Sequence, residues 1–240
     1  MRPARREARL SRRSLGDQIA DQLRQEILLG QLEPGTAISQ QGLCEVYGTS
    51  RMPVRDALVK LMNEGLLHSG IGGQAVVARL TREDILDSFD IEAVVHSRAA
   101  RRATIAAGEE ELSYLEQLHE EMVEAHRAGD LERVGELNWA FHRTINLASG
   151  SPKLIAMMRT VSLDVPRDYL KELPGWAERA NSEHAEIVAA FRARDADRVA
   201  ELMQRHLERA GANLVEYLES NGRLDQAGMT VAPDSAALIS

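Results

Sequence analysis

The sequence predicts a mainly α-helical protein of two domains, with β structure confined to a short hairpin in the first. The chain has 240 residues, of which 44% are hydrophobic but only 4% aromatic. This balance is typical of helical cores built from Leu, Ala, Val and Met. A chain of this length usually forms two domains. Beyond residue 80 the apolar residues recur at helical spacing without any strand pattern, which predicts an all-helical bundle.

The composition excludes a membrane-spanning protein. No stretch of about 18 uncharged apolar residues occurs, and the arginine-rich start lacks the apolar run of a secretory signal. We therefore expect a cytoplasmic protein without a membrane partner. The single cysteine, Cys44, has no second thiol for a disulfide or a cysteine-based metal site.

Charge is distributed unevenly along the chain. Residues 1–80 hold 11 Lys or Arg against 8 Asp or Glu, whereas the remaining residues hold 18 against 29. A basic part joined to an acidic part suits a module that binds a polyanion, with nucleic acid as the leading candidate. Residues 1–13 read as a disordered basic arm, either lying along phosphates or simply solvated. Residues 221–240 read as a disordered tail.

Three short helices are predicted in the first domain, residues 14–80. Apolar residues four apart indicate a first helix from Leu15 to Leu29, capped by Ser14. A second helix is expected over residues 39–47. The third begins after Ser50, with Pro53 in its first turn, where a missing N–H costs little. The predicted apolar faces are Leu15, Ile19, Leu23 and Ile27 in the first helix and Val54, Ala57, Leu58, Leu61 and Met62 in the third.

Two arginines, Arg51 and Arg55, project from the exposed start of the third helix. Two helices separated by a short turn, the second basic at its start, form the helix-turn-helix that enters the major groove. The following stretch, "LLHSGIGGQAVVARL", predicts a two-stranded hairpin, or wing, whose tip glycines, including Gly72, allow close approach to a backbone. The alternative is that the arginines pair with acids such as Asp56 on a solvated face.

Residues 15–80 resemble the winged helix of GntR-family bacterial transcription regulators. The segments "GQLEPGTAIS" and "TSRMPVRDALVKLMNEGLL" carry the resemblance, the second almost residue for residue. It implies a dimer that reads a palindromic operator in double-stranded DNA, most often as a repressor. Gln41 stands where some members have an arginine. The DNA-contacting residues implied or expected are Ser50, Arg51, Met52, Pro53, Arg55, Gln41 and Gly72.

The second domain is predicted as helices over residues 81–220. Thr81 caps the first helix, with acidic residues in the first turn. Pro166 should kink or interrupt the fourth. The helices after the first are expected at residues 109–127, 130–148, 151–173 and 178–219, the last broken near residues 194–197.

Polar residues lie within the apolar faces of three of these helices. Asn138 and His142 are four apart on one helix, and His184 and His206 lie on two others. Each histidine alone fits a core imidazole bonded to a neighbour, whereas three together fit a shared metal ion. His119 and His126 also lie near an apolar stripe, so the pattern does not choose among them.

The second domain resembles the FCD effector domain of the FadR-like subfamily, whose metal-binding members carry Asp-x-x-x-His and two later histidines. The matching segments are "NWAFH", "SEHAEIV" and "MQRHLERA". The resemblance implies a divalent metal, zinc first, with nickel or manganese as alternatives. Asn138 replaces the aspartate, and a neutral amide oxygen should lower affinity or change the metal preference. The implied ligands are Asn138, His142, His184 and His206.

The resemblance also implies a small-molecule effector in the helical domain, with homodimerisation. The family usually shows Arg-x-x-Leu-Glu in the first helix, and its arginine holds an anionic effector, but this chain reads "EAVVH". Glu92 and His96 are therefore the expected effector-binding residues, and an organic acid can still bind through the metal. The alternative is a hydrolytic enzyme that uses the histidine site, although no carboxylate is placed as an obvious general base.

Overall fold

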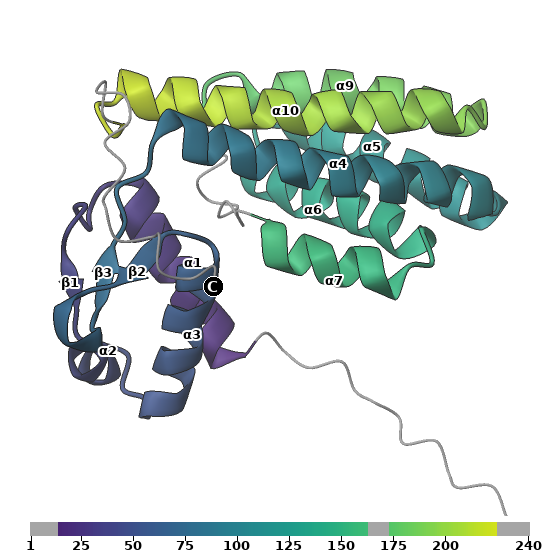
Figure 1. The fold of residues 1–240 in the computed structure, drawn as a ribbon. Helices are drawn as coiled ribbons and strands as arrows, with labels where there is room; N and C mark the ends of the chain where they lie inside the picture. Colours follow the sequence, from purple (N-terminus) through teal and green to yellow (C-terminus); the bar gives the residue numbers. More distant parts are fainter. Residues whose placement is uncertain (1–13, 163–172, 225–240) are drawn as a thin grey trace, which may run out of the picture. The chain divides into compact units, whose positions relative to one another are not determined.

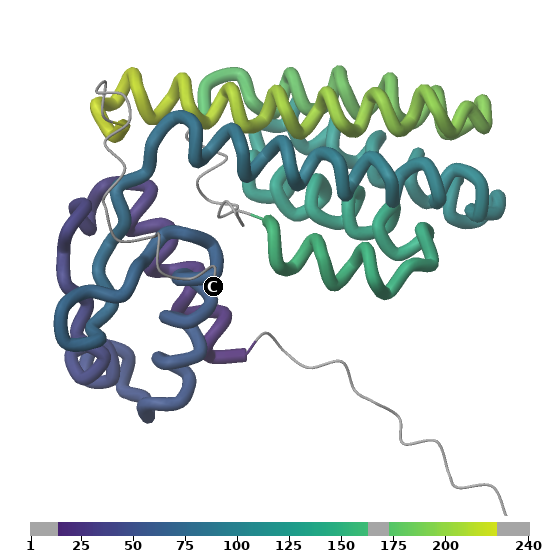
Figure 2. The backbone as a smooth tube through the Cα atoms, viewed as in Figure 1, coloured from purple at the N-terminus to yellow at the C-terminus, as the bar shows by residue number. Residues whose placement is uncertain are grey.

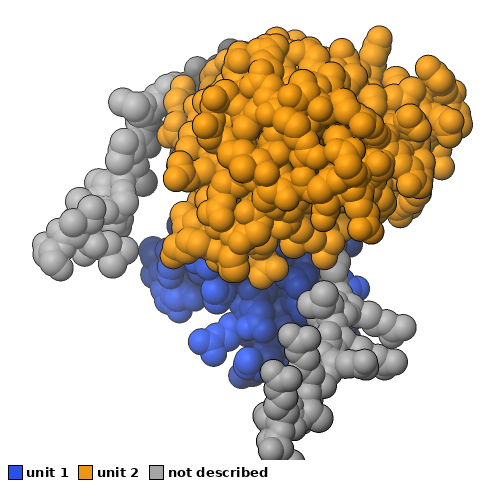
Figure 3. Space-filling view, turned by 90° about the vertical axis from the view of Figure 1, so that its right-hand side faces the viewer, with its two compact units in different colours: residues 1–79, 164–166 blue, residues 80–163, 167–240 orange. Residues whose placement is uncertain are grey.

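The computed structural model describes residues 14–162 and 173–224, and the chain divides into two compact units between residues 79 and 80 (Figures 1 and 3). Unit 1 comprises the described residues up to 79, and unit 2 comprises the described residues from 80 onward. The mainly helical fold class is confirmed. The predicted arm, residues 1–13, and most of the predicted tail lie outside the described residues. Within the described part, no helix is long and apolar enough to cross a membrane.

Unit 1 has three helices and a small antiparallel sheet. The helices are α1 (Leu15–Leu28), α2 (Gln40–Val46) and α3 (Arg51–Asn63), and the strands are β1 (Ala37–Ile38), β2 (Leu67–Ser69) and β3 (Ala75–Val77). The sheet order is β1-β3-β2. The expectation of a two-stranded hairpin was incomplete, because Ala37 pairs with Val76 and adds a third strand. Two residues are too short a run for alternation to predict a strand.

The buried face of α1 differs slightly from the predicted one. Ile19, Leu23 and Ile27 are buried, but Leu15 is 46% exposed. Gly16 is buried instead, and a Cβ added there would lie 3.1 Å from the Pro53 carbonyl oxygen. The close approach of α1 to the start of α3 therefore runs through Gly16, which leaves Leu15 at the edge of the contact.

The stripe predicted for α3 is buried at Val54, Ala57, Leu58 and Leu61, whereas Met62 is only half-buried. Ser50 occupies the predicted N-cap position, but its side chain makes no capping hydrogen bond. The packing of the stripe, rather than a capping bond from Ser50, therefore holds the exposed start of α3 in place.

A buried ion pair joins α1 to the end of α3. The Arg24 side chain is fully buried, and its Nε and Nη2 atoms each donate to a Glu64 carboxylate oxygen at 2.8 Å. Asp21 accepts from Nη1 of the same guanidinium at 2.7 Å. Removing one partner of a buried pair typically costs about 3–5 kcal/mol, because the other charge stays buried. This pair fixes α3 relative to α1.

Unit 2 is helical throughout its described residues. Thr81 and Asp84 form the capping box that starts α4, as predicted. The fourth predicted helix, residues 151–173, ends earlier than expected, because α7 stops at Val161 and Ser162 has an extended backbone, whereas Pro166 lies outside the described residues. The predicted break near 194–197 is confirmed, because α9 ends at Arg192 and α10 begins at Ala196. The helices are α4 (Arg82–Ala106), α5 (Glu109–Arg127), α6 (Leu131–Ala148), α7 (Pro152–Val161), α9 (Trp176–Arg192) and α10 (Ala196–Ser220).

Five of these helices surround one interior. The contacts run from α4 to α6, α6 to α5, α5 to α9, α9 to α10 and from α10 back to α4. Figure 2 shows α4 and α10 side by side, although they stand at opposite ends of the unit in sequence. Side chains on the inner faces of the five helices therefore meet in one place.

Candidate DNA-binding surface and metal centre

The start of α3 presents an exposed, positively charged surface. Ser50, Arg51 and Arg55 are exposed, Pro53 is half-buried, and Met52 is 61% exposed. Because α3 buries its opposite stripe, the two arginines extend from a fixed helix end. The structure thus brings these five predicted residues together at one end of α3.

Neither Arg51 nor Arg55 makes an ion pair with any acid in the part of the chain that the structure describes. The alternative that they pair with Asp56 is therefore wrong for this structure. Instead, the backbone oxygen of Arg51 accepts a hydrogen bond from Gln40 Nε2 at 3.1 Å, which ties α2 to α3. Gln41 is exposed on α2 and donates to Glu45 Oε1 at 3.3 Å.

The wing follows directly after α3. Between β2 and β3 the residues Ile71–Gly73 form a single 3-10 turn, and Gly72 has φ 81°, a left-handed conformation that favours glycine. The neighbouring Ile71 is 98% exposed. The exposure of Ile71 was not predicted from the sequence, although an apolar residue followed by two glycines at a hairpin tip was the available signal.

Three histidines from three helices meet inside unit 2. His142 lies on α6, His184 on α9 and His206 on α10, and one ring nitrogen from each lies within 4.8 Å of the others. The Nε2 atoms of His142 and His206 are 3.2 Å apart. Two nitrogens at about 2.0–2.1 Å from one tetrahedral zinc ion are roughly 3.3 Å apart. The three predicted histidine ligands therefore form one cluster, and the His142–His206 pair has the separation of two zinc ligands, whereas the fourth predicted ligand, Asn138, is not part of the cluster.

The surroundings of His184 show whether the residues of this cluster fit a metal ion. Its side chain is 0% exposed and stacks on Phe141 at 4.4 Å between ring centroids. Both ring nitrogens are buried, and neither has a hydrogen-bond partner among the described residues. An unsatisfied buried polar group costs about 1–3 kcal/mol. A coordinated cation would satisfy one of these nitrogens, so the residues present fit a metal.

A carboxylate supports His206 from outside the cluster. Glu183 Oε2 lies 2.6 Å from His206 Nδ1, and Arg209 donates to Glu183 Oε1 at 3.0 Å. Burial raises the pKa of Glu183, but hydrogen bonds from His206 and Arg209 outweigh burial and leave the pKa below its usual value. An ionised Glu183 accepts a hydrogen bond from Nδ1–H of His206, which leaves Nε2 free to coordinate. Glu183 was not predicted from the sequence, where its only signal was its place beside His184.

Asn138 and the two predicted effector residues lie near the same interior. Asn138 is half-buried, one turn before His142 on α6. His96 lies edge-on to His142, with ring centroids 6.4 Å apart. Its Nε2 is 3.5 Å from Glu92 Oε1, and Ser162 donates to the same oxygen at 2.8 Å. His96 Nδ1 is buried with no hydrogen-bond partner among the described residues.

The other two histidines of interest differ from the cluster. His119 on α5 reaches the backbone oxygen of Asn181 at 3.1 Å through Nε2, which is the ordinary arrangement of a core imidazole. His126 is half-buried near the end of α5. The structure therefore separates the three clustered histidines from these two, which the sequence pattern did not.

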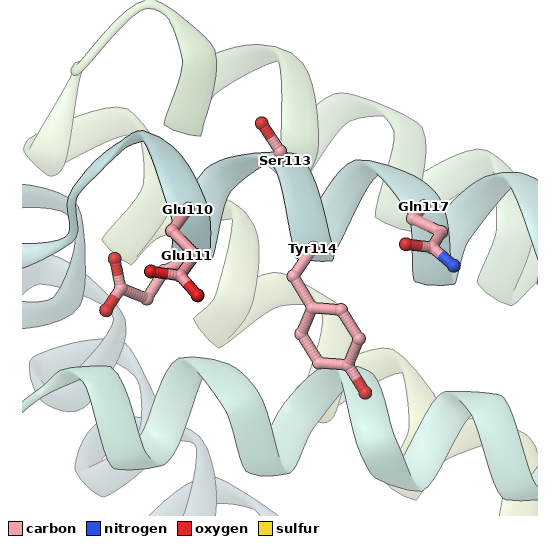
Figure 4. Close-up of a pocket in the computed structure, with 5 residues that line it drawn as sticks. All are labelled: Glu110, Glu111, Ser113, Tyr114 and Gln117. Atoms are coloured by element: carbon pink, nitrogen blue, oxygen red, sulfur yellow. The ribbon is translucent and has the colours of Figure 1, made fainter.

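An open pocket lies beside α5 (Figure 4). Its volume is about 440 Å³, and it is lined by Glu110, Glu111, Ser113, Tyr114 and Gln117. Because all five residues are exposed on one side of a single helix and none is a histidine, the pocket offers no convergent set of metal or anion ligands.

The buried histidines predict a pH-dependent stability of the metal-free protein. Burial, and secondarily His206, lowers the pKa of His96 from 6.5 to about 4. Burial and neighbouring histidines also hold the pKa values of His142 and His184 well below 6.5. The unfolded chain then binds more protons than the folded one below pH 6.5. Stability should fall as pH drops through this window, by about 1.4 kcal/mol per pH unit for each group.

Urea unfolding of the chelator-treated protein at pH 7.5, 6.5 and 5.5 measures this dependence. Replacing His96 by leucine should make the dependence shallower. An unfolding free energy that stays constant from pH 7.5 to 5.5 contradicts the assignment of neutral, buried imidazoles.

Both units match known protein families. Residues 15–77 match the profile of "Bacterial regulatory proteins, gntR family", and residues 87–209 match that of the FCD domain. The chain is 28% identical over 195 residues to a gluconate operon transcriptional repressor of Bacillus licheniformis, covering 78% of this chain and 80% of the relative. It is 26% identical over 225 residues to a probable D-xylose utilization operon transcriptional repressor of Paenarthrobacter nicotinovorans, covering 91% and 96%.

A solved structure supports the fold independently. The structure of E. coli McbR/YncC matches with a TM-score of 0.65 at 24% identity, covering 85% of this chain and 98% of that one. At this identity the likeness concerns the fold alone.

Proposed function

We propose that this chain, which belongs to the GntR family of bacterial transcription regulators with an FCD domain, is a repressor controlled by a small molecule. Membership of this family makes it a transcription regulator and not an enzyme. Relatives that are named transcriptional repressors support the proposal of repression. The hydrolytic alternative is set aside on the same grounds.

DNA reading is assigned to the start of α3 and to the wing. The observation that supports it best is the pair of exposed arginines, four residues apart and without acidic partners among the described residues, at the end of a packed helix. Arg51 and Arg55 contact base edges and phosphates in the major groove. Ser50, Met52 and Pro53 line the groove, Gln41 contacts the flanking backbone, and Gly72 lets the wing tip approach it.

His142, His184 and His206 would hold a divalent ion, with zinc as the first candidate and nickel or manganese as alternatives. The ion supplies a Lewis-acidic point of attachment for a ligand oxygen when bound. Asn138, one turn before His142, offers a neutral amide oxygen as a further ligand. Affinity should then be lower than with a carboxylate at this position.

The effector is assigned to His96 and Glu92. Glu92 Oε1 already accepts from Ser162, and the nitrogen of His96 that faces this carboxylate is the one that carries a proton. The buried Nδ1 of His96 is then an acceptor without a partner among the described residues. An organic acid that binds through the metal fits best if it also carries a hydroxyl or amine donor.

The protein acts as a cytoplasmic homodimer that reads the two half-sites of a palindromic operator. The effector releases DNA only if it binds the DNA-free form more tightly than the DNA-bound form, since equal affinity shifts nothing.

Selection of DNA from a random duplex pool by the purified full chain tests the proposal. The enriched sequences should contain an inverted repeat whose half-sites are spaced by about one helical turn or a multiple of it. Affinity for this repeat should exceed that for bulk genomic DNA at the same salt concentration. Enrichment of no sequence, with equal binding to bulk DNA, would remove the DNA-reading function.

A further inference from the structure

Several buried polar atoms remain unsatisfied on the helices that carry the clustered histidines. Besides both nitrogens of His184, the Nδ1 atom of His142 has no hydrogen-bond partner among the described residues. The same holds for Oδ1 of Asn146 and for both side-chain polar atoms of Asn181. Buried polar groups normally find partners, so this group of unsatisfied donors and acceptors needs an explanation.

A bound metal satisfies only one nitrogen of each histidine. Histidines that ligate metals almost always donate their other N–H to a carboxylate, a carbonyl or water, and this bond fixes the tautomer. His206 already has such a partner in Glu183, at 2.6 Å. His142 and His184 have none among the described residues, so two outer acceptors are missing from an otherwise ordered site.

Two asparagines lie close in sequence to these two histidines, on the same helices. Asn146 follows His142 by four residues on α6, and Asn181 precedes His184 by three residues on α9. Residues three or four apart are neighbours on one helix face. Helical side chains also lean toward the N-terminus. Asn146 and His142 on α6, and Asn181 and His184 on α9, are therefore neighbours along their helices, although no hydrogen bond joins either pair in the structure.

We propose that Asn146 and Asn181 are positioning residues whose amide oxygens accept the non-coordinating N–H of His142 and of His184 in the metal-bound form. The inference rests on the metal site of the proposed function. Two unsatisfied donors and two unsatisfied acceptors are thereby paired within their own helices. Because Asn146 and Asn181 are neutral, His206 remains the only one of the three with a carboxylate partner and is the most basic ligand.

Zinc affinity of the full chain, measured by competition with a chelating indicator, tests the proposal. Asn146→Leu and Asn181→Leu should each weaken zinc binding by roughly 10–100-fold, the usual effect of losing an outer partner. Asn146→Asp and Asn181→Asp should bind zinc at least as tightly as the native chain. The control Asn213→Leu, at a half-buried asparagine on α10, should leave affinity unchanged.

A readout of histidine tautomers separates positioning from a merely structural role. Long-range ¹H–¹⁵N spectra of the zinc-loaded chain should show one protonated nitrogen on His142 and on His184, with a proton shift that the Leu variants lose. If a Leu variant does not fold, the spectrum of the native chain and the zinc affinities of the Asp variants still test the proposal.

Native zinc affinity in both Leu variants overturns the inference, as does equal weakening by Leu and Asp. In those cases the native chain still binds zinc, so the metal site itself stands. A native chain that binds no zinc instead removes the metal site and this inference with it.

Discussion

Replacing Arg51 and Arg55 together by alanine is expected to lower the affinity for the selected operator by roughly 2–6 kcal/mol, since each good contact of this kind contributes about 1–3 kcal/mol. The corresponding loss in binding is about 30-fold to 10⁴-fold. Both side chains are exposed and lack acidic partners among the described residues, so the fold should be unaffected. Fluorescence anisotropy of labelled operator at one fixed salt concentration measures the change.

The matched control is the double variant Arg98→Ala, Arg102→Ala. These two arginines are also exposed and four apart, but they lie on α4 in unit 2. The control removes the same charge and should change operator affinity by much less than the first variant. If the two double variants weaken binding equally, net charge rather than the start of α3 explains the affinity.

The second large effect is expected from His184→Leu. The substitution removes one of three clustered ligands, so zinc affinity should fall by more than the roughly 10–100-fold that loss of an outer partner costs. At about 100 times its dissociation constant, zinc should stabilise the native chain by about 2.7 kcal/mol, and the variant should lose this stabilisation. Thermal unfolding with zinc and with chelator measures both.

Without metal, His184→Leu should no longer lower the stability of the protein. His184 is fully buried with two unsatisfied nitrogens, so a leucine of similar size should leave the chelator-treated protein at least as stable as the native one. His126→Leu, outside the cluster, should keep the response to zinc. A native chain whose melting temperature is unaffected by either zinc or chelator contradicts the metal site.

The helices of unit 2 were largely predictable because local signals mark them. Thr81 caps α4 as its sequence suggests, and the break between α9 and α10 follows a loss of helical periodicity. Strand β1 was not predictable from alternation, because it has only two residues and depends on its pairing with β3.

The histidine cluster was predictable in part. Spacing placed His142, His184 and His206 on apolar faces, but only packing could show that α6, α9 and α10 turn these faces toward one point. Spacing also placed His119 near an apolar stripe, as if it were a further candidate ligand, although His119 bonds to a backbone oxygen instead. The role of Glu183 was hidden, because it neighbours His184 in sequence yet supports His206 on another helix.

The closed circuit of α4, α6, α5, α9 and α10 determines which segment of the chain can be transferred to another protein. The three clustered histidines span residues 142–206 of the sequence and lie on three different helices of that circuit. No proteolytic fragment shorter than this span retains all three. A chimaera that joins this helical domain to another DNA-binding domain must therefore contain residues 81–220 as one uninterrupted segment.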